Sequence, residues 1–189
     1  ELGWKGANGI SGGKEYTIQA GGGICQVSTT LYNALLCANM EIVDRRAHTI
    51  PSDYVPVGLD ATVDTRGIDF VWKNNTDMPA YIFAKVENVE GSSSRHTITV
   101  YVYGKPLPEG VTYQSRNEII EERSRQDEAI YTNDASIPTG YQLERVQGHK
   151  YYVAEAYQDK YVDGKLAESK LLHLEFHKSQ DEIELWFDW

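Results

Sequence analysis

The chain has 189 residues and a formal net charge of −10, and 41% of its residues are hydrophobic. This composition is typical of a folded globular protein and excludes a disordered or low-complexity one. No apolar stretch approaches the roughly 20 residues of a membrane-spanning helix. An acidic chain without a stripe of lysine and arginine is a poor nucleic-acid binder, so we expect no nucleic-acid partner. The chain starts at Glu1 without an initiator methionine or a signal-like segment, so we expect a cut end.

A glycine run at 21–23 leads into a segment whose apolar spacing predicts a helix from residue 24. The expected core stripe of this helix consists of Val27, Leu31, Ala34, Leu35 and Ala38. Cys25 lies off that stripe, at the start of the helix, on the face that carries Thr29, Tyr32 and Leu36.

The two cysteines, Cys25 and Cys37, are twelve residues apart in this segment. A continuous helix would separate their Cα atoms by about 18 Å, whereas a disulfide needs Cα atoms within about 7 Å. We therefore expect two free thiols, with Cys37 buried in the core as a small hydrophobic side chain.

Short β signals follow the helix. Residues 68–72 predict a strand and 74–77 a turn, and residues 80–86 and 97–103 predict a pair of strands around Gly91. The Pro- and Gly-rich stretch 104–110 is typical of a boundary. We therefore expect two domains, 1–104 and 105–189.

The second domain is predicted to be small and all-β. Segments 151–161 and 165–178 flank Asp163-Gly164, a strong signal for a two-residue hairpin turn, whereas 116–126 is ambiguous between helix and strand. His173, Glu175 and His177 alternate with Leu172, Leu174 and Phe176. The polar set could bind a metal, but no further ligand is apparent, so we expect a solvated face opposite a buried one and no metal.

The placement of Cys25 favours a nucleophile. The positive end of a helix and its free N–H groups stabilise a thiolate, which is the reactive form of cysteine. The backbone N–H groups of Cys25 and Gln26 could also bind an oxyanion. A phosphate-binding loop is excluded because no Gly-Lys-Ser/Thr sequence follows the glycines.

A cysteine nucleophile needs a base and a group that orients the base. His48 follows downstream as the candidate base, and Asp60 as its orienting carboxylate, with Asp64 as the alternative. Papain-like and transglutaminase-like enzymes use the order Cys, His, Asp. We therefore expect an α+β fold in which a Cys-bearing helix packs against an antiparallel sheet, as in those enzymes, followed by the small all-β domain.

The segment 21–33, GGGICQVSTTLYN, resembles the signature of the VanW family, first named from vancomycin-resistance gene clusters. Later blocks at 45–48, 54–62 and 73–77 resemble the same family, so the resemblance covers about residues 1–104. The family's usual Phe-Ser-Phe-Asn segment before the glycines is absent, and Arg46-Ala47 stands where His-Pro is common. We therefore expect a piece of a longer exported or anchored protein. The second part faintly resembles a G-five wall module at 137–140, 147–148 and 163–164.

The VanW resemblance implies a peptidoglycan L,D-transpeptidase that needs no cofactor. Cys25 would form a thioester with the third residue of a stem peptide, and His48 would transfer protons. Arg45, Tyr54 and Gln26 are the expected contacts to the stem-peptide partner. The resemblance also implies an extracellular protein at the bacterial wall, attached to a membrane only through an N-terminal anchor absent from this chain.

Two alternatives to the transpeptidase stay open. One is a wall amidase or endopeptidase that uses the same cysteine and histidine. The other is a non-catalytic wall-binding module in which Cys25 is buried and inert.

Overall fold

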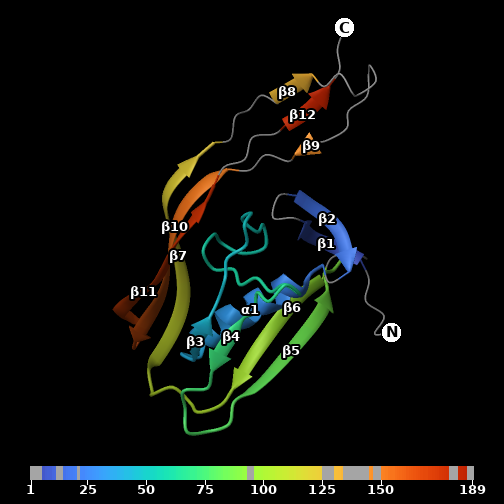
Figure 1. The fold of residues 1–189 in the computed structure, drawn as a ribbon. Helices are drawn as coiled ribbons and strands as arrows, with labels where there is room; N and C mark the ends of the chain where they lie inside the picture. The colour runs from blue at the N-terminus through green and yellow to red at the C-terminus, as the bar shows by residue number, and fades with distance from the viewer. Residues whose placement is uncertain are drawn as a thin grey trace.

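The computed structural model shows a mostly β chain, with one helix among the described residues (Figure 1). The structure describes residues 6–11, 15–20, 22–92, 96–124, 130–133, 145–146, 150–178 and 183–186. Two of the segments that resemble the G-five module, 137–140 and 147–148, lie outside these ranges.

The first half of the chain forms three strand pairs and the helix. The pairs are β1 (Gly6–Ser11) with β2 (Glu15–Ala20), β3 (Glu41–Asp44) with β4 (Val71–Lys73), and β5 (Tyr81–Asn88) with β6 (His96–Tyr103), all antiparallel. The helix is α1, Ile24–Cys37. The predicted helix and the predicted pairing of 80–86 with 97–103 are confirmed, whereas the strand predicted at 68–72 begins only at Val71.

The second half is built mainly on one twisted three-stranded sheet of order β11-β10-β7, formed by β7 (Val111–Arg123), β10 (Tyr151–Val162) and β11 (Lys165–His177). Asp163 and Gly164 have φ angles of 50° and 75°, as the predicted hairpin turn requires. The ambiguous segment 116–126 is strand as far as Arg123. A smaller sheet of order β8-β12-β9 contains β8 (Ile130–Asn133), β9 (Arg145–Val146) and β12 (Ile183–Trp186).

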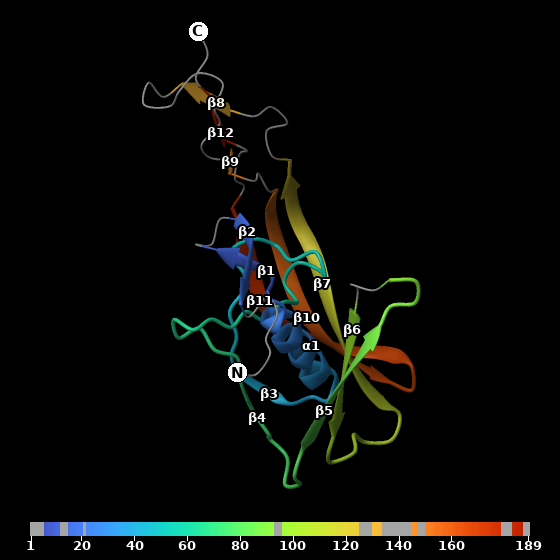
Figure 2. The same cartoon turned by 90° about the vertical axis from the view of Figure 1, so that its right-hand side faces the viewer.

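The expected α+β class with a papain- or transglutaminase-like arrangement is wrong. The described strands form five separate sheets of two or three strands, antiparallel apart from the parallel β8–β12 pair. Strands β3, β6 and β7, which contact α1, belong to three different sheets (Figure 2). The order of Cys, His and Asp along a chain reports a possible site, but it does not determine how strands pair.

The predicted core face of α1 is also wrong in part. Tyr32, Leu35 and Leu36 are 2%, 0% and 1% exposed, whereas Val27 is 45% exposed. The buried side therefore includes the face that carries Cys25. Two polar residues can be buried there because Ser28 Oγ and Thr29 Oγ1 donate to the carbonyl of Ala61, at 2.6 and 3.3 Å.

The burial of Cys37 differs from the prediction. Both cysteines are free, as expected, but Cys37 is exposed as a residue instead of lying in the core. It is the last residue of α1. Its thiol lies against β7 and hydrogen-bonds the backbone of Ser115, and desolvation there raises the pKa of Cys37.

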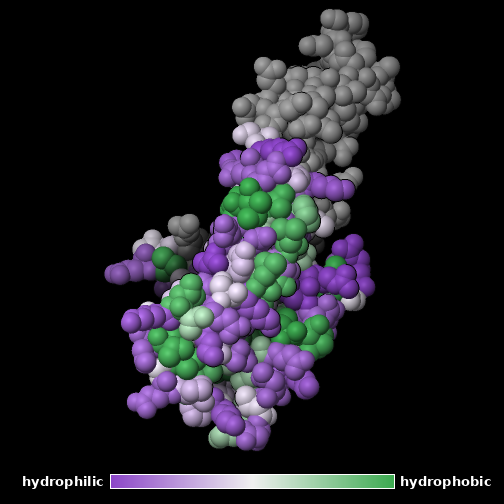
Figure 3. Space-filling view, turned by 90° about the vertical axis from the view of Figure 1, so that its left-hand side faces the viewer, coloured by the Kyte–Doolittle hydropathy of each residue, from purple (hydrophilic) through white to green (hydrophobic). Residues whose placement is uncertain are grey.

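The polar face of β11 faces inward, which reverses the prediction. Glu175 and His177 are 7% and 2% exposed, whereas Leu174 and Phe176 are 46% and 63% exposed. Hydrophobic and hydrophilic side chains are accordingly interspersed on the side of the molecule shown in Figure 3. The inward face is polar because an arginine from the first half of the chain, Arg45, ion-pairs with Glu175.

The two predicted domains contact each other directly. Ser115 on β7 donates to the side chain of Asn33 at 2.8 Å, and the amide of Gln158 on β10 donates to the carbonyl of Leu36 at 2.7 Å. The boundary at 104–105 stays a prediction. Among the described residues, no helix is long and apolar enough to cross a membrane.

Candidate functional site

Cys25 occupies the second position of α1, directly after a tight backbone turn. Gly23 precedes the helix with a φ of 89°, a conformation that glycine adopts without strain. The Cys25 Sγ lies 3.4 Å from Thr62 Oγ1 and 3.4 Å from the carbonyl oxygen of Val63, and it also hydrogen-bonds the side chain of His48. The thiol is half-buried and therefore still reachable from solvent.

His48 and Asp60 lie behind this thiol. His48 Nδ1 donates to Asp60 Oδ2 at 2.5 Å, and the backbone N–H of His48 donates to the same oxygen at 2.7 Å. The two residues are 9% and 3% exposed. Because Nδ1 is bonded to Asp60, Nε2 is the ring nitrogen that remains for the hydrogen bond with the Cys25 thiol. The structure therefore brings the predicted Cys25, His48 and Asp60 into one hydrogen-bonded line.

The electrostatics of this line favour a thiolate beside an imidazolium. Burial opposes ionisation of Cys25, but the hydrogen bonds from His48 and Thr62 and the His48 charge lower its pKa from 9.0 to about 7. Burial also opposes the charged form of His48, but its bonds to Asp60 and Cys25 raise its pKa to about 9. Between these values the thiol is ionised and the imidazole is protonated.

The alternative orienting carboxylate, Asp64, does not reach the histidine. Its oxygens bind Arg66 at the surface, with the shortest contact at 2.5 Å. Asp60 is buried, and although burial opposes its ionisation, the hydrogen bond from His48 and the charge of Arg45 lower its pKa. Asp60 is therefore the carboxylate that orients His48.

Arg45, predicted as a substrate contact, is not at the surface. Its side chain is 8% exposed and binds Asp60 Oδ1 at 2.7 Å as well as Glu175. Tyr54 is 41% exposed and meets the His48 ring edge to face, with the centroids 6.4 Å apart. Tyr54 is therefore exposed beside His48, and its contact with substrate stays a prediction, whereas Arg45 is a buried part of the framework.

Gln26 follows the nucleophile in the first turn of α1. Its backbone N–H donates to the carbonyl of Gly23 at 3.1 Å, and its role in binding an oxyanion stays a prediction. Within the described residues, the N–H of Cys25 has no hydrogen-bond acceptor. The Gln26 side chain is half-buried, and its predicted contact with substrate stays a prediction.

Several residues of the site escaped the sequence analysis. Ser28 and Thr29 hold the loop at Ala61 against the helix, which places Thr62 beside the thiol. Polar side chains three and four positions after Cys25 were the available signal. Glu175 and His173 come from β11. The sequence analysis named them as a polar strand face, but no local pattern connected them with the Cys25 site, more than 110 positions away.

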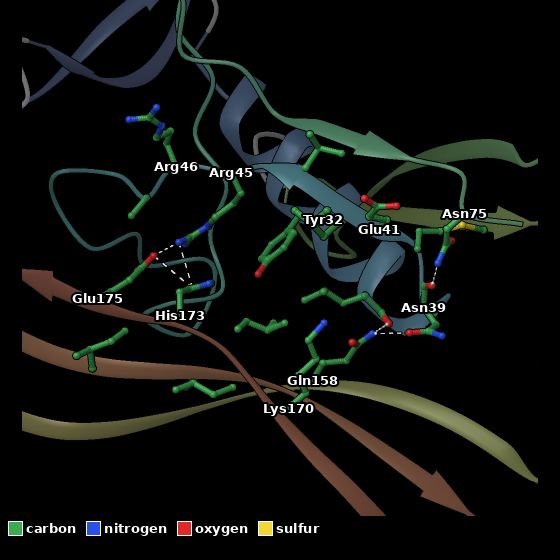
Figure 4. Close-up of a pocket in the computed structure, with 18 residues that line it drawn as sticks. Tyr32, Asn39, Glu41, Arg45, Arg46, Asn75, Gln158, Lys170, His173 and Glu175 are labelled. Carbon is green, nitrogen blue, oxygen red and sulfur yellow. Dashed lines mark hydrogen bonds and ion pairs between the residues drawn. The ribbon is translucent and has the colours of Figure 1, made fainter.

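A cavity of about 680 Å³ lies beside this framework, between β3 and β11. Arg45, His173 and Glu175 are in its wall, and Tyr32 and Lys170 also line it (Figure 4). Cys25 is not among the lining residues. The part of the chain that the structure describes has no group of three or more His, Cys, Asp or Glu side chains arranged to hold a metal ion.

Comparison with known proteins identifies the family. The sequence profile described as VanW like protein matches residues 1–99, about half of the chain. The chain belongs to the VanW family. It is also similar to the uncharacterized protein YoaR of Bacillus subtilis (strain 168), with 52% identity over 65 residues. That match covers 34% of this VanW chain and 22% of YoaR, so the chain matches only a small part of that relative.

A solved structure titled HP0197-G5 is similar to part of the VanW chain at 25% identity, covering 39% of this chain and 96% of that one. Its TM-score of 0.19 is too low to support an argument about the fold. Membership of the VanW family indicates a protein associated with the bacterial cell wall.

The lowered pKa of Cys25 leads to a labelling prediction. Because the thiolate is the form that reacts, alkylation of Cys25 by iodoacetamide is expected to reach half its maximal rate near pH 7. Cys37, whose pKa is raised, should react only at much higher pH. The measurement is the rate of modification of each cysteine peptide by mass spectrometry across pH 5 to 10.

His48→Gln supplies the control for this prediction, since loss of the imidazolium should move the Cys25 midpoint to higher pH. A Cys25 that is inert, or that titrates at an ordinary thiol pKa of about 8.5, would contradict the prediction and favour the non-catalytic wall-binding module.

Proposed function

We propose that this VanW chain is a peptidoglycan L,D-transpeptidase that uses Cys25 as its nucleophile. The observation that carries the proposal is the hydrogen-bonded line of Cys25, His48 and Asp60, with the carboxylate and imidazole buried and the thiol half-buried. Nucleophile, base and orienting group are the parts that acyl transfer through a thioester requires.

In the first half-reaction, the Cys25 thiolate attacks the carbonyl carbon of the third residue of a donor stem peptide. The bond from that carbon to the nitrogen of the fourth residue, D-alanine, breaks. His48 gives its proton to the departing amine, which leaves as D-alanine. The products are a Cys25 thioester and a neutral imidazole, held in orientation by Asp60.

In the second half-reaction, the side-chain amine of the third residue of a neighbouring stem attacks the thioester carbonyl. Neutral His48 takes the proton from this amine, and the carbon–sulfur bond breaks. The cross-link is then complete, and the thiolate and imidazolium are restored. The pKa values of about 7 for Cys25 and about 9 for His48 support this cycle, because about half of the thiol is ionised at pH 7 and the pair is mostly charged between pH 7 and 9.

Substrate contacts are proposed on the exposed side of the site. The N–H of Cys25, at the positive end of α1, is the candidate oxyanion donor. Tyr54 stands at the surface against His48 and is the candidate contact to the stem peptide. Gln26, one position beyond the nucleophile, is a further candidate.

The experiment that tests the function supplies purified tetrapeptide stems to the protein and analyses the products by mass spectrometry. We expect dimers joined between third residues, release of one D-alanine per cross-link, and a thioester adduct on Cys25 when the acceptor amine is blocked. Hydrolysed stems without any dimer would contradict transpeptidation and favour an amidase or endopeptidase. If neither dimers nor hydrolysed stems form, both enzyme functions are contradicted.

A further inference from the structure

The buried ion pair between Arg45 and Glu175 connects two distant parts of the chain. Glu175 lies on β11, outside the residues 1–99 that match the VanW family. It is nevertheless 7% exposed, and both of its carboxylate oxygens are buried. A carboxylate is rarely buried so completely unless a cation compensates its charge, and here that cation is Arg45.

Arg45 is held on several sides. Its NH2 group donates to Asp60 Oδ1 at 2.7 Å, its Nε donates to the carbonyl of Asp60, and its NH1 group ion-pairs with Glu175 (Figure 4). The Tyr32 ring lies under the guanidinium, with 5.6 Å from the Arg45 Cζ to the ring centroid. The guanidinium thus bridges the carboxylate that orients His48 and a carboxylate from β11.

We propose that Glu175 is a positioning residue of the Cys25 site: it holds Arg45, and Arg45 in turn holds Asp60 against His48. This inference deepens the proposed function and rests on it for its catalytic meaning. The described partners of the Cys25 thiol do not include Glu175, so its contribution is made through Arg45 and Asp60.

The charges around Glu175 support this role. His173 and His177 face the carboxylate from the same strand, with nitrogen–oxygen distances of 3.4 and 3.5 Å. Burial lowers the pKa of both histidines, so they are neutral at neutral pH. Arg45 is therefore the cation that faces two carboxylates, Asp60 and Glu175, and the three groups together carry one net negative charge.

That negative charge acts on His48. With Glu175 present, the positive charge of Arg45 is divided between two carboxylates, so the negative charge of Asp60 is only partly offset and still attracts the His48 imidazolium. Without the charge of Glu175, Arg45 would offset Asp60 alone. The His48 imidazolium would then be less stable. Arg45, which binds Asp60, would also lose the contact with Glu175 that fixes its position.

The test is the titration of His48, followed by NMR of the imidazole in the full chain and assigned with His48→Gln. In Glu175→Gln the pKa of His48 should fall clearly below its value of about 9, because one negative charge is lost. Glu175→Asp keeps the negative charge but has a shorter side chain that reaches Arg45 less well. Its His48 pKa should therefore lie between that of the unmodified chain and that of Glu175→Gln. Far-ultraviolet circular dichroism and thermal melting establish that each variant is folded.

Glu168→Gln is the matched control, since Glu168 is an exposed glutamate on the same strand and the change in charge is the same. Its His48 pKa should equal that of the unmodified chain. A folded Glu175→Gln with an unchanged His48 pKa, or a Glu168→Gln that lowers it equally, would overturn the inference. If Glu175→Gln does not fold, Glu175→Asp decides, and a His48 pKa there equal to that of the unmodified chain would overturn it.

The titration needs no wall substrate, so the inference and the proposed function can fail separately. A chain that never forms cross-links but shows the His48 shift refutes the transpeptidase and keeps the coupling of β11 to the site. If cross-linking is observed, Glu175→Gln should lower kcat and leave KM nearly unchanged, because Glu175 does not contact substrate.

Discussion

Replacing Cys25 with alanine is expected to abolish formation of cross-links between third residues of stem peptides, a loss on the order of 10⁴-fold or more. The variant keeps His48 and Asp60 but has no sulfur to form the thioester. Because the thiol is half-buried and its contacts among the described residues, besides the bond to His48, are two weak ones at 3.4 Å, stability should change by no more than about 1 kcal/mol. Quantifying dimeric muropeptides after incubation with tetrapeptide stems measures the effect.

The chain contains its own control for this substitution. Cys37→Ala removes the other thiol, which lies at the opposite end of α1, and should leave cross-linking unchanged. If Cys25→Ala still formed dimers at a rate comparable with that of Cys37→Ala, a cysteine nucleophile would be ruled out. A loss of activity in both variants would point to a general effect on the helix.

Replacing Arg45 with methionine is expected to destabilise the fold by about 3–5 kcal/mol, the usual cost of removing one partner from a buried ion pair. Methionine preserves most of the volume but leaves the Glu175 carboxylate without its cation and the Asp60 carboxylate with His48 alone. The side chains of Asp60 and Glu175 are only 4% and 8% exposed, so water cannot compensate their charges. The free energy of unfolding, measured with chemical denaturant at pH 7, checks this. Protonation of the two carboxylates should recover part of the loss as the pH falls.

The neighbouring residue supplies the comparison. Arg46 is 68% exposed and lies 3.6 Å from Asp44, so Arg46→Met should change the free energy of unfolding by less than about 1 kcal/mol. Equal effects of the two substitutions would mean that the buried network around Arg45 contributes little to the fold.

Local signals in the sequence were sufficient for individual elements. The glycine run before Ile24 predicted the start of α1, because only glycine reaches the φ of 89° at Gly23 without strain. Asp163-Gly164 predicted the β10–β11 turn for the same kind of reason. These features depend on a few adjacent residues, so no distant contact is needed to establish them.

The buried face of α1 was harder to predict. Apolar spacing selected the face with Val27, yet the interior contacts the face with Thr29 and Tyr32. Polar residues at the helix surface could be buried because the backbone at Ala61 supplies hydrogen-bond partners. That loop lies more than 30 positions away, and a periodicity argument cannot include it.

The sequence alone predicts the helix, the β5–β6 and β10–β11 hairpins, the VanW family and the candidate residues Cys25, His48 and Asp60. Which carboxylate contacts His48, the burial of Arg45 and the inward polar face of β11 with Glu175 became known from the folded chain. Turns and helix starts can be predicted because they follow from the conformations of adjacent residues. Buried charges, in contrast, are placed by compensation, and their partners come from strands and loops that are far apart in the chain.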